Sequence, residues 1–236
     1  ALIDAVTDLV AVNDRARRIV TKAITDPDDR VRLAVVTRLA KLQTVDACRV
    51  LCRALGDPTR ETAKIAAAAV NVELQRKELD GRKLTLQERQ ARMLALIDAR
   101  GLEEGARHKE DMNRHFVAQL SIRYLDAGGR LSIETLCRFI SDRRKQIRTM
   151  KISPPTMRWA NFLLREVDGK TLREADVVAI SSLTLEKEAN TRIQAYQILT
   201  LASSGPGRGE VLAQGLADEN ASIRRDVAGW LAPGPG

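Results

Sequence analysis

One pattern of residues recurs around three aspartates, and it constrains the fold of the 236-residue chain more than any other feature. Apolar or small residues lie seven, six, three and two positions before Asp26, Asp57 and Asp218, and an apolar residue follows each at plus thirteen. Asp26 and Asp57 are 31 residues apart, and a weaker copy is centred on Glu186, 32 residues before Asp218. Internal repeats of this length indicate one supersecondary unit that is used several times.

Each copy predicts two helices joined by an acidic turn. The spacing before the aspartate places apolar residues on one face of a first helix, and the apolar positions after it define a second helix. We expect the aspartate to end the first helix and to cap the second, because its carboxylate can accept free backbone N–H groups and a following Pro27 or Pro58 is tolerated in a first turn. One such hairpin cannot bury its apolar faces alone, so neighbouring hairpins must stack.

This pattern resembles the HEAT repeat family, including the short bacterial HEAT-like units. The resemblance covers roughly the first 75 and the last 55 residues, and it departs from the family at Ala63, where the usual arginine is missing. It implies an all-α fold, an α-solenoid of helical hairpins, which usually binds proteins and sometimes nucleic acids and which carries no catalytic residues. The other interpretation is a set of amphipathic helices in an unrelated bundle. The resemblance depends on Asp26-Pro27…Val31-Arg32, Asp57-Pro58…Thr62 and Asp218…Ile223-Arg224.

The composition fits a helical protein without a membrane anchor. Hydrophobic residues make up 44% of the chain, charged residues 30% and aromatic residues 3%, so the core must consist of aliphatic side chains. The longest apolar run, Ile65–Val70, is much shorter than the ~20 residues of a membrane-spanning helix. Three cysteines do not make a disulfide framework in a chain of this length, which favours a cytoplasmic location. The first residue, Ala1, indicates a processed product or a piece of a longer protein.

Charge and repeat pattern together predict a division of the chain into parts. We expect HEAT-like repeats in residues 1–78 and 171–232, a basic helical middle region in residues 79–170, and a flexible tail in residues 233–236. Residues 81–170 contain 19 basic and 11 acidic residues and so account for the net charge of +8 of the whole chain. The middle region consists either of degenerate repeats or of an inserted helical domain.

Local signals predict several helices in the middle region. Thr85 and Glu88 have the spacing of a capping box, and we expect the helix that they begin to continue to Gly101. A second helix is predicted to end at Gly128-Gly129, and a third to follow Ser132. The segment 156–164 resembles the second helix of a repeat.

The segment 133–152 admits two interpretations. Small residues at Cys137 and Ser141, with apolar residues between, match the loose template of a helix-turn-helix, whose second helix would be the basic stretch near Arg143. Against this, Asp142 stands where an apolar residue is expected, and the turn lacks glycine. The alternative is the solvated basic face of one continuous helix, which suits an acidic protein partner equally well.

Three groups of residues suggest chemistry only weakly. Cys48 and Cys52 share one helix face and could supply half of a metal site, but both lie on or beside an apolar stripe and are predicted to be core residues. His108 and His115 also share a face and are predicted to be ordinary surface histidines. The glycine-rich segment 203–212 lacks the Lys-Ser/Thr of a phosphate-binding P-loop and is predicted to be a linker between repeats. The sequence therefore predicts no catalytic residue, no metal, no cofactor and no small-molecule substrate.

The sequence favours a non-catalytic helical-repeat scaffold that binds another macromolecule, most directly a protein with an acidic surface. The second helices of the repeats would supply exposed arginines for that partner, namely Arg32, Arg38, Arg224 and Arg225. The alternative is a nucleic-acid-binding protein that uses the stretch 138–151, with Arg138, Arg143, Arg144, Lys145, Arg148 and Lys151. A third hypothesis is an enzyme, either a HEAT-like DNA glycosylase or a metal-dependent activity.

Overall fold

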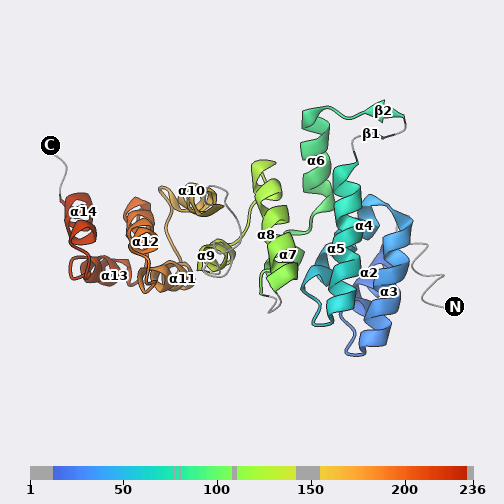
Figure 1. Cartoon of the computed structure of the whole chain (residues 1–236), viewed down its shortest axis with the longest axis horizontal. Coiled ribbons are helices and arrows are strands. Elements are labelled where there is room, and N and C mark those ends of the chain that lie inside the picture. Colours follow the sequence, from blue (N-terminus) through green and yellow to red (C-terminus); the bar gives the residue numbers. More distant parts are fainter. Residues whose placement is uncertain (1–12, 77, 80, 108–110, 142–154, 233–236) are drawn as a thin grey trace. The chain divides into compact units, whose positions relative to one another are not determined.

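The computed structural model describes residues 13–76, 78–79, 81–107, 111–141 and 155–232. These residues form mainly helices, together with a short antiparallel hairpin of β1 (Glu78–Leu79) and β2 (Arg82–Lys83) (Figure 1). The chain divides into two compact units, residues 1–131 and residues 132–236, called unit 1 and unit 2 below. The division falls inside the predicted basic middle region, which contributes helices to both units. The predicted all-α fold class, built from helical hairpins, is confirmed for the described residues.

The described part of unit 1 begins with two helical hairpins whose second helices pack along each other (Figure 1). The first is formed by α2 (Asp14–Ala23) and α3 (Asp29–Leu42), and the second by α4 (Val45–Arg53) and α5 (Arg60–Gln75). A single 3₁₀ turn, residues 54–56, extends α4 into the acidic turn. The unit continues with α6 (Leu86–Leu96), α7 (Ala99–Gly105) and α8 (Asp111–Asp126).

The apolar positions of the repeat form the core of unit 1. Val20 and Leu39 in the first hairpin and Leu55 and Val70 in the second are all almost completely buried. Burial of each such aliphatic side chain stabilises the fold by about 1.5–3 kcal/mol relative to full exposure. The two hairpins are therefore held together by the residues that recur in the sequence.

The spacing that recurs around the anchor aspartates reflects a turn and not a helix cap. The Asp26 carboxylate accepts the backbone N–H of Asp28 at 2.9 Å, and the residue that caps α3 is Asp28, whose side chain accepts the N–H of Arg30. Asp57 likewise accepts the N–H of Thr59 at 2.7 Å. The expectation that the anchor aspartate caps the second helix is therefore wrong. A carboxylate that bonds the amide two residues ahead closes the turn instead.

The predicted helix from Thr85 to Gly101 is two helices in the structure. Its start is confirmed, because Thr85 and Glu88 form the capping box. Its end is wrong, because α6 stops at Leu96 and the Asp98 side chain caps α7. Asp98 also accepts a hydrogen bond from Arg53 Nε at 2.9 Å. This contact with a residue of α4 holds Asp98 at the break between α6 and α7, although the local sequence favours a continuous helix.

Gly101 lies inside α7, where it allows the backbones of α7 and α4 to approach closely. A Cβ atom at this position would overlap the carbonyl group of Cys52. The glycine that the sequence marks as a helix end is thus a packing residue.

Unit 2 contains six helices among the described residues, and its last four repeat the hairpin pattern of unit 1 (Figure 1). The helices are α9 (Ile133–Ser141), α10 (Pro155–Val167), α11 (Glu174–Thr184), α12 (Ala189–Leu201), α13 (Arg208–Gly215) and α14 (Ala221–Leu231). α12 packs against both α10 and α14. Trp159 in α10 stacks on Phe139 with their ring centroids 4.5 Å apart, which joins α10 to α9.

Only the first half of the glycine-rich segment 203–212 is a linker, because α13 already begins at Arg208. The Leu172 N–H donates to the Ser204 carbonyl at 2.8 Å, and the Ser203 N–H donates to the Lys170 carbonyl at 3.0 Å. The linker before α11 and the linker before α13 therefore run side by side. Gly207 has φ 72°, a conformation that favours glycine, and it starts α13.

Candidate macromolecule-binding surface

The guanidinium of Arg32 joins the two hairpins of unit 1. Its Nη1 donates to the carbonyls of Asp26 and Pro27 in its own turn, at 2.8 and 3.1 Å. Its Nε and Nη2 donate to the two carboxylate oxygens of Asp57 in the next turn, at 2.7 and 3.3 Å. Both side chains are buried, so a charge-assisted, bidentate pair is the arrangement that satisfies them.

Arg192 makes the same contacts in unit 2. Its Nη1 donates to the carbonyls of Glu186 and Lys187, at 2.9 and 3.0 Å. Its Nε and Nη2 each donate to one carboxylate oxygen of Asp218 at 2.9 Å. This arginine lowers the pKa of Asp218 below its ordinary value of 3.8. We call this arrangement the arginine junction: an arginine six residues after one anchor reaches the anchor aspartate of the next hairpin.

The arginine junction corrects one sequence-based expectation. Arg32 is 8% exposed and engaged on both sides, so the expectation that it is an exposed arginine available to an acidic partner is wrong. The signal for this role was present in the sequence as the pair of offsets, plus six for the arginine and plus 31 or 32 for the aspartate. The offsets alone do not show that the arginine side chain reaches the aspartate of the next hairpin.

The other predicted arginines of the repeats lie at different depths. Arg38 is half-buried and already engaged in an interaction. Arg224 and Arg225 are exposed on α14, and Arg225 forms an ion pair with its neighbour Asp226, at 3.3 Å. Arg32 and Arg38 belong to unit 1, whereas Arg224 and Arg225 belong to unit 2.

Most of the predicted basic stretch lies outside the described residues. Arg138 is the member that the structure places, on α9, where it forms an ion pair of 3.0 Å with Glu134. The remaining members and the second helix of the helix-turn-helix template fall within residues 142–154: Arg143, Arg144, Lys145, Arg148 and Lys151. The nucleic-acid hypothesis therefore stays a prediction.

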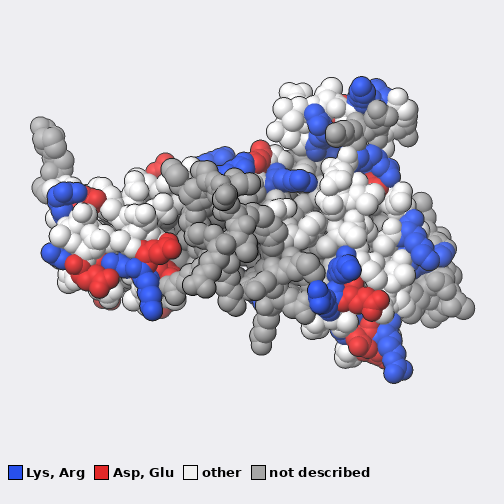
Figure 2. Space-filling view, in the orientation of Figure 1, with Lys and Arg blue, Asp and Glu red and all other residues white. Residues whose placement is uncertain are grey.

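An apolar groove runs between α3 and α5 in unit 1, and it was not expected from the sequence. Its cavity volume is about 280 Å³. Small and aliphatic side chains line it because the helices meet at alanines, and Val72 on its edge is 54% exposed. Figure 2 shows a largely uncharged surface over α5, with both basic and acidic residues around it. The lining residues are Leu39, Ala40, Gln43, Cys48, Leu51, Ile65, Ala68, Ala69, Val72 and Glu73.

Two arginines converge on the only charged residue that lines this α3–α5 groove. Glu73 is almost completely buried, and its two carboxylate oxygens each lie 2.6 Å from a guanidinium nitrogen, one of Arg76 and one of Arg92. Arg76 also donates to the side-chain carbonyl of Gln43, at 3.3 Å. Two positive charges on one carboxylate leave this end of the groove with an excess of positive charge.

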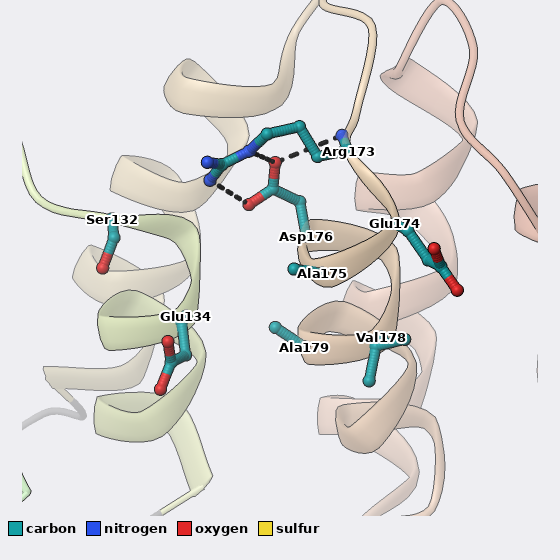
Figure 3. Close-up of a pocket in the computed structure, with 8 residues that line it drawn as sticks. All are labelled: Ser132, Glu134, Arg173, Glu174, Ala175, Asp176, Val178 and Ala179. Carbon is teal, nitrogen blue, oxygen red and sulfur yellow. Dashed lines mark hydrogen bonds and ion pairs between the residues drawn. The ribbon is translucent and has the colours of Figure 1, made fainter.

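A second groove, between α9 and α11 in unit 2, has the opposite charge. Its cavity volume is about 540 Å³, and the carboxylates of Glu134, Glu174 and Asp176 line it with a single guanidinium, that of Arg173. Figure 3 shows the Arg173 guanidinium lying over the Asp176 carboxylate. Both of its hydrogen bonds to that carboxylate are 2.9 Å long, so the arginine is neutralised within the chain.

Of the candidate metal-ligand side chains in the sequence, the structure describes only those of the cysteines. Cys48 and Cys52 are buried, as predicted for core residues, and burial raises the pKa of each thiol to about 12. His108 and the side chain of His115 lie outside the described part of the chain. Within the part that the structure describes, no group of three or more His, Cys, Asp or Glu side chains could hold a metal ion. None of the described helices is long and apolar enough to cross a membrane.

Comparison with known proteins identifies the repeat type. Residues 3–70 match the family model described as HEAT repeats. Solved structures similar to this chain include an engineered protein, with 17% sequence identity, coverage of 93% of this chain and 96% of the other, and a TM-score of 0.36. Another is the archaeal HEAT-like repeats protein from Thermococcus onnurineus NA1, with 14% identity, coverage of 97% and 90%, and a TM-score of 0.34. None of the curated proteins is significantly similar in sequence to the chain.

Proposed function

We propose that this chain, with its HEAT-like repeats, is a non-catalytic scaffold that binds a partner protein in the α3–α5 groove. The groove fits an amphipathic helix that carries apolar residues on one face and an acidic residue near one end. The single observation that carries the proposal is an apolar floor that ends at Glu73, Arg76 and Arg92, a carboxylate shared by two guanidiniums.

The apolar floor supplies the reason for binding. Val72 is more than half exposed on a helix whose neighbouring groove residues are alanines, so water lies against an apolar surface. An amphipathic helix that lays its apolar face into such a groove removes this surface from water.

The arginines at the end of the groove supply the preference for an acidic partner. Arg76 is about one-third exposed, whereas the Glu73 carboxylate below it is buried. A carboxylate of the partner would therefore meet the arginine first, and the attraction would weaken as salt is added.

A pull-down scored for protein and nucleic acid together tests the proposal. The wild-type chain is compared with the variants Val72→Asp and Val72→Lys. We expect Val72→Asp to weaken capture of the partner about tenfold or more, because it places a charge at the edge of the apolar groove and repels an acidic ligand. Val72→Lys should weaken capture less, since its charge attracts the same ligand.

Val178→Asp is the matched control, because Val178 is also an exposed helical valine, 61% exposed, but lies in unit 2 beside the acidic groove. If Val178→Asp reduced capture of the partner as much as Val72→Asp, the result would contradict the α3–α5 groove as the binding site. The nucleic-acid alternative would be supported instead if the wild-type chain captured nucleic acid and this capture were lost when Glu replaced Arg143, Arg144 and Lys145.

A further inference from the structure

A small polar pocket in unit 1 is formed by the first helices of its two hairpins, and it shares no lining residue with the α3–α5 groove. Its cavity volume is about 150 Å³. We call it the arginine pocket, because three of its lining residues are arginines. The lining residues are Arg17 and Thr21 of α2, Asp46, Arg49, Val50 and Arg53 of α4, and Asp98 before α7.

The arginine pocket and the α3–α5 groove use different faces of α4. The residues of α4 that line the pocket follow one another at intervals of three, one and three positions, which is one stripe of a helix with 3.6 residues per turn. Cys48 and Leu51, the residues of α4 that line the groove, point from the other side of the helix. A ligand in the pocket therefore leaves the groove open for another partner.

Both carboxylates of the arginine pocket already have a guanidinium. Arg53 Nε donates to the Asp98 carboxylate at 2.9 Å. Arg17 Nη2 lies 3.3 Å from the Asp46 carboxylate, and its Nη1 lies 3.3 Å from that of Asp14. The contacts of Arg17 are longer than that of Arg53 and hence weaker, so its guanidinium can also attract a further negative charge.

Arg49 is the third guanidinium of the pocket, and it is exposed. Among the described residues, no carboxylate pairs with it, so three guanidiniums face two carboxylates and one positive charge is left over. Two more donors of the pocket have no acceptor within the described part of the chain, the hydroxyl of Thr21 and the buried Nε of Arg17. A buried donor without an acceptor costs free energy, which an acceptor supplied by a ligand would recover.

We propose that the arginine pocket binds a phosphate group, either free or carried by a serine or threonine side chain of a partner protein. Arg49 would donate to two phosphate oxygens as a bidentate pair. The Thr21 hydroxyl and the Arg17 Nε would donate to the third oxygen. Because Arg49 is exposed, the pocket is open to a group that is attached to another chain.

The number and position of the donors favour phosphate over a carboxylate. A carboxylate has two oxygens, and a bidentate contact with Arg49 would use both of them. A phosphate monoester has three acceptor oxygens and a charge of about −1.5 to −2 at pH 7, so it can also engage donors on α2. The pocket already holds two carboxylates, so a third would compete with Asp46 and Asp98 without an advantage in charge.

Calorimetric titration of the full chain at low ionic strength tests this proposal. The ligands are inorganic phosphate, a short Ala-Gly peptide with one phosphoserine, and the same peptide with glutamate in place of phosphoserine. We expect the phosphopeptide to bind about tenfold or more tightly than the glutamate peptide, because it offers a third oxygen and more charge. The phosphopeptide binds more tightly than inorganic phosphate if a partner protein carries the group, whereas the reverse order indicates free phosphate.

Variants locate the binding site. Arg49→Gln should weaken binding of the tighter phosphate ligand about tenfold, and Thr21→Val about threefold, because each removes a donor. Arg18→Gln is the matched control, since Arg18 is exposed on α2, lies outside the lining of the pocket and carries the same charge as Arg49. It should leave the dissociation constant within about twofold of the wild-type value, because an exposed charge outside the pocket is screened by solvent.

Three results would overturn the proposal. The first is that neither inorganic phosphate nor the phosphopeptide binds. The second is that Arg49→Gln and Arg18→Gln weaken binding equally, which would mean that only the net charge of the chain attracts the ligand. The third is that a single-stranded oligonucleotide binds more tightly than both phosphate ligands and depends on Arg49, which would assign the pocket to nucleic acid.

Discussion

The arginine junction of unit 1 and that of unit 2 have the same donors and acceptors but different surroundings. In unit 1 the Arg32 Nη2 also donates to the Thr59 hydroxyl at 3.1 Å, and the helices α6–α8 follow the hairpin that it reaches. In unit 2 the Arg192 Nη2 lies 3.1 Å from the exposed Glu219 carboxylate, and the hairpin that it reaches is the last one described. In both units the arginine at plus six is therefore structural, because it is buried and pairs with the anchor aspartate of the next hairpin.

The largest effect is expected from removing the arginine of either junction. Arg32→Met should destabilise unit 1, and Arg192→Met unit 2, by about 3–5 kcal/mol, because each leaves a buried carboxylate without its partner. Thiol labelling distinguishes the units, since burial raises the pKa of all three thiols to about 12 and so protects them in the native state.

In Arg32→Met, labelling of Cys48 and Cys52 should accelerate while that of Cys137 does not, and Arg192→Met should do the reverse. Arg225→Met serves as the exposed control. Equal acceleration of all three thiols in either variant would show that the junctions do not stabilise the units separately.

A smaller loss of stability is expected when alanine replaces a tightly packed glycine, Gly101 in unit 1 or Gly215 in unit 2. Gly101→Ala should cost about 1–3 kcal/mol or more, because the added Cβ would meet the backbone of Cys52 and lie 2.8 Å from the Arg53 nitrogen. Gly215→Ala should cost less, because its Cβ would meet the Tyr196 ring at 3.0 Å, and a side chain can shift more easily than a backbone. Urea unfolding of both variants checks the order, and a larger loss in Gly215→Ala would contradict it.

The third effect is a loss of the stability of unit 2 at low pH. The folded pKa of Asp218 is lowered, first by its hydrogen bonds from Arg192, so its contribution to stability is complete above the ordinary value of 3.8. That contribution is lost as the pH falls through the lowered folded pKa. Both tryptophans, Trp159 and Trp230, belong to unit 2, so their fluorescence follows the acid unfolding of that unit alone.

Asp218→Asn should flatten this dependence on acid, while Asp226→Asn, on the same hairpin, should leave it unchanged. A fluorescence transition that keeps the same slope with pH in Asp218→Asn would show that another group controls acid unfolding in unit 2.

The smallest effect is expected at Arg224, which stands six residues after Asp218 and donates to the carbonyls of Asp218 and Glu219. Arg224→Gln should change the free energy of unfolding of unit 2 by about 0.5 kcal/mol or less, because the side chain is exposed and pairs with no described carboxylate. Arg192→Gln, in the same urea series, should cost several times more. An equal loss of stability in the two variants would contradict the difference between a buried junction arginine and an exposed one.

The sequence predicts the positions of the helices better than it predicts which residues lie on the surface. The anchors Asp26, Asp57 and Asp218 predict three hairpins because apolar residues that flank them are buried in the core, among them Val20, Leu55 and Leu212. The end of α6 was missed because Asp98 caps a new helix while also pairing with Arg53, 45 positions earlier in the chain. No local pattern contains that contact.

The candidate surfaces show the same limit. Arg32 and Arg224 occupy the same position in the repeat, and only the presence of Asp57 beside Arg32 makes one buried and the other exposed. The α3–α5 groove likewise depends on how two helices that are separated along the chain meet at their alanines.

The sequence by itself determined the repeating unit: two helices, an acidic turn, and the aliphatic positions that face the core. These follow from local hydrogen bonding and from the burial of apolar side chains at a helical period. Only the tertiary structure decided which charged residues are neutralised inside the fold and which remain free to bind. That outcome depends on distances between residues remote in sequence, such as the 2.7 Å between Arg32 and Asp57, because the energy of a charge depends on its partner and on its exposure to water.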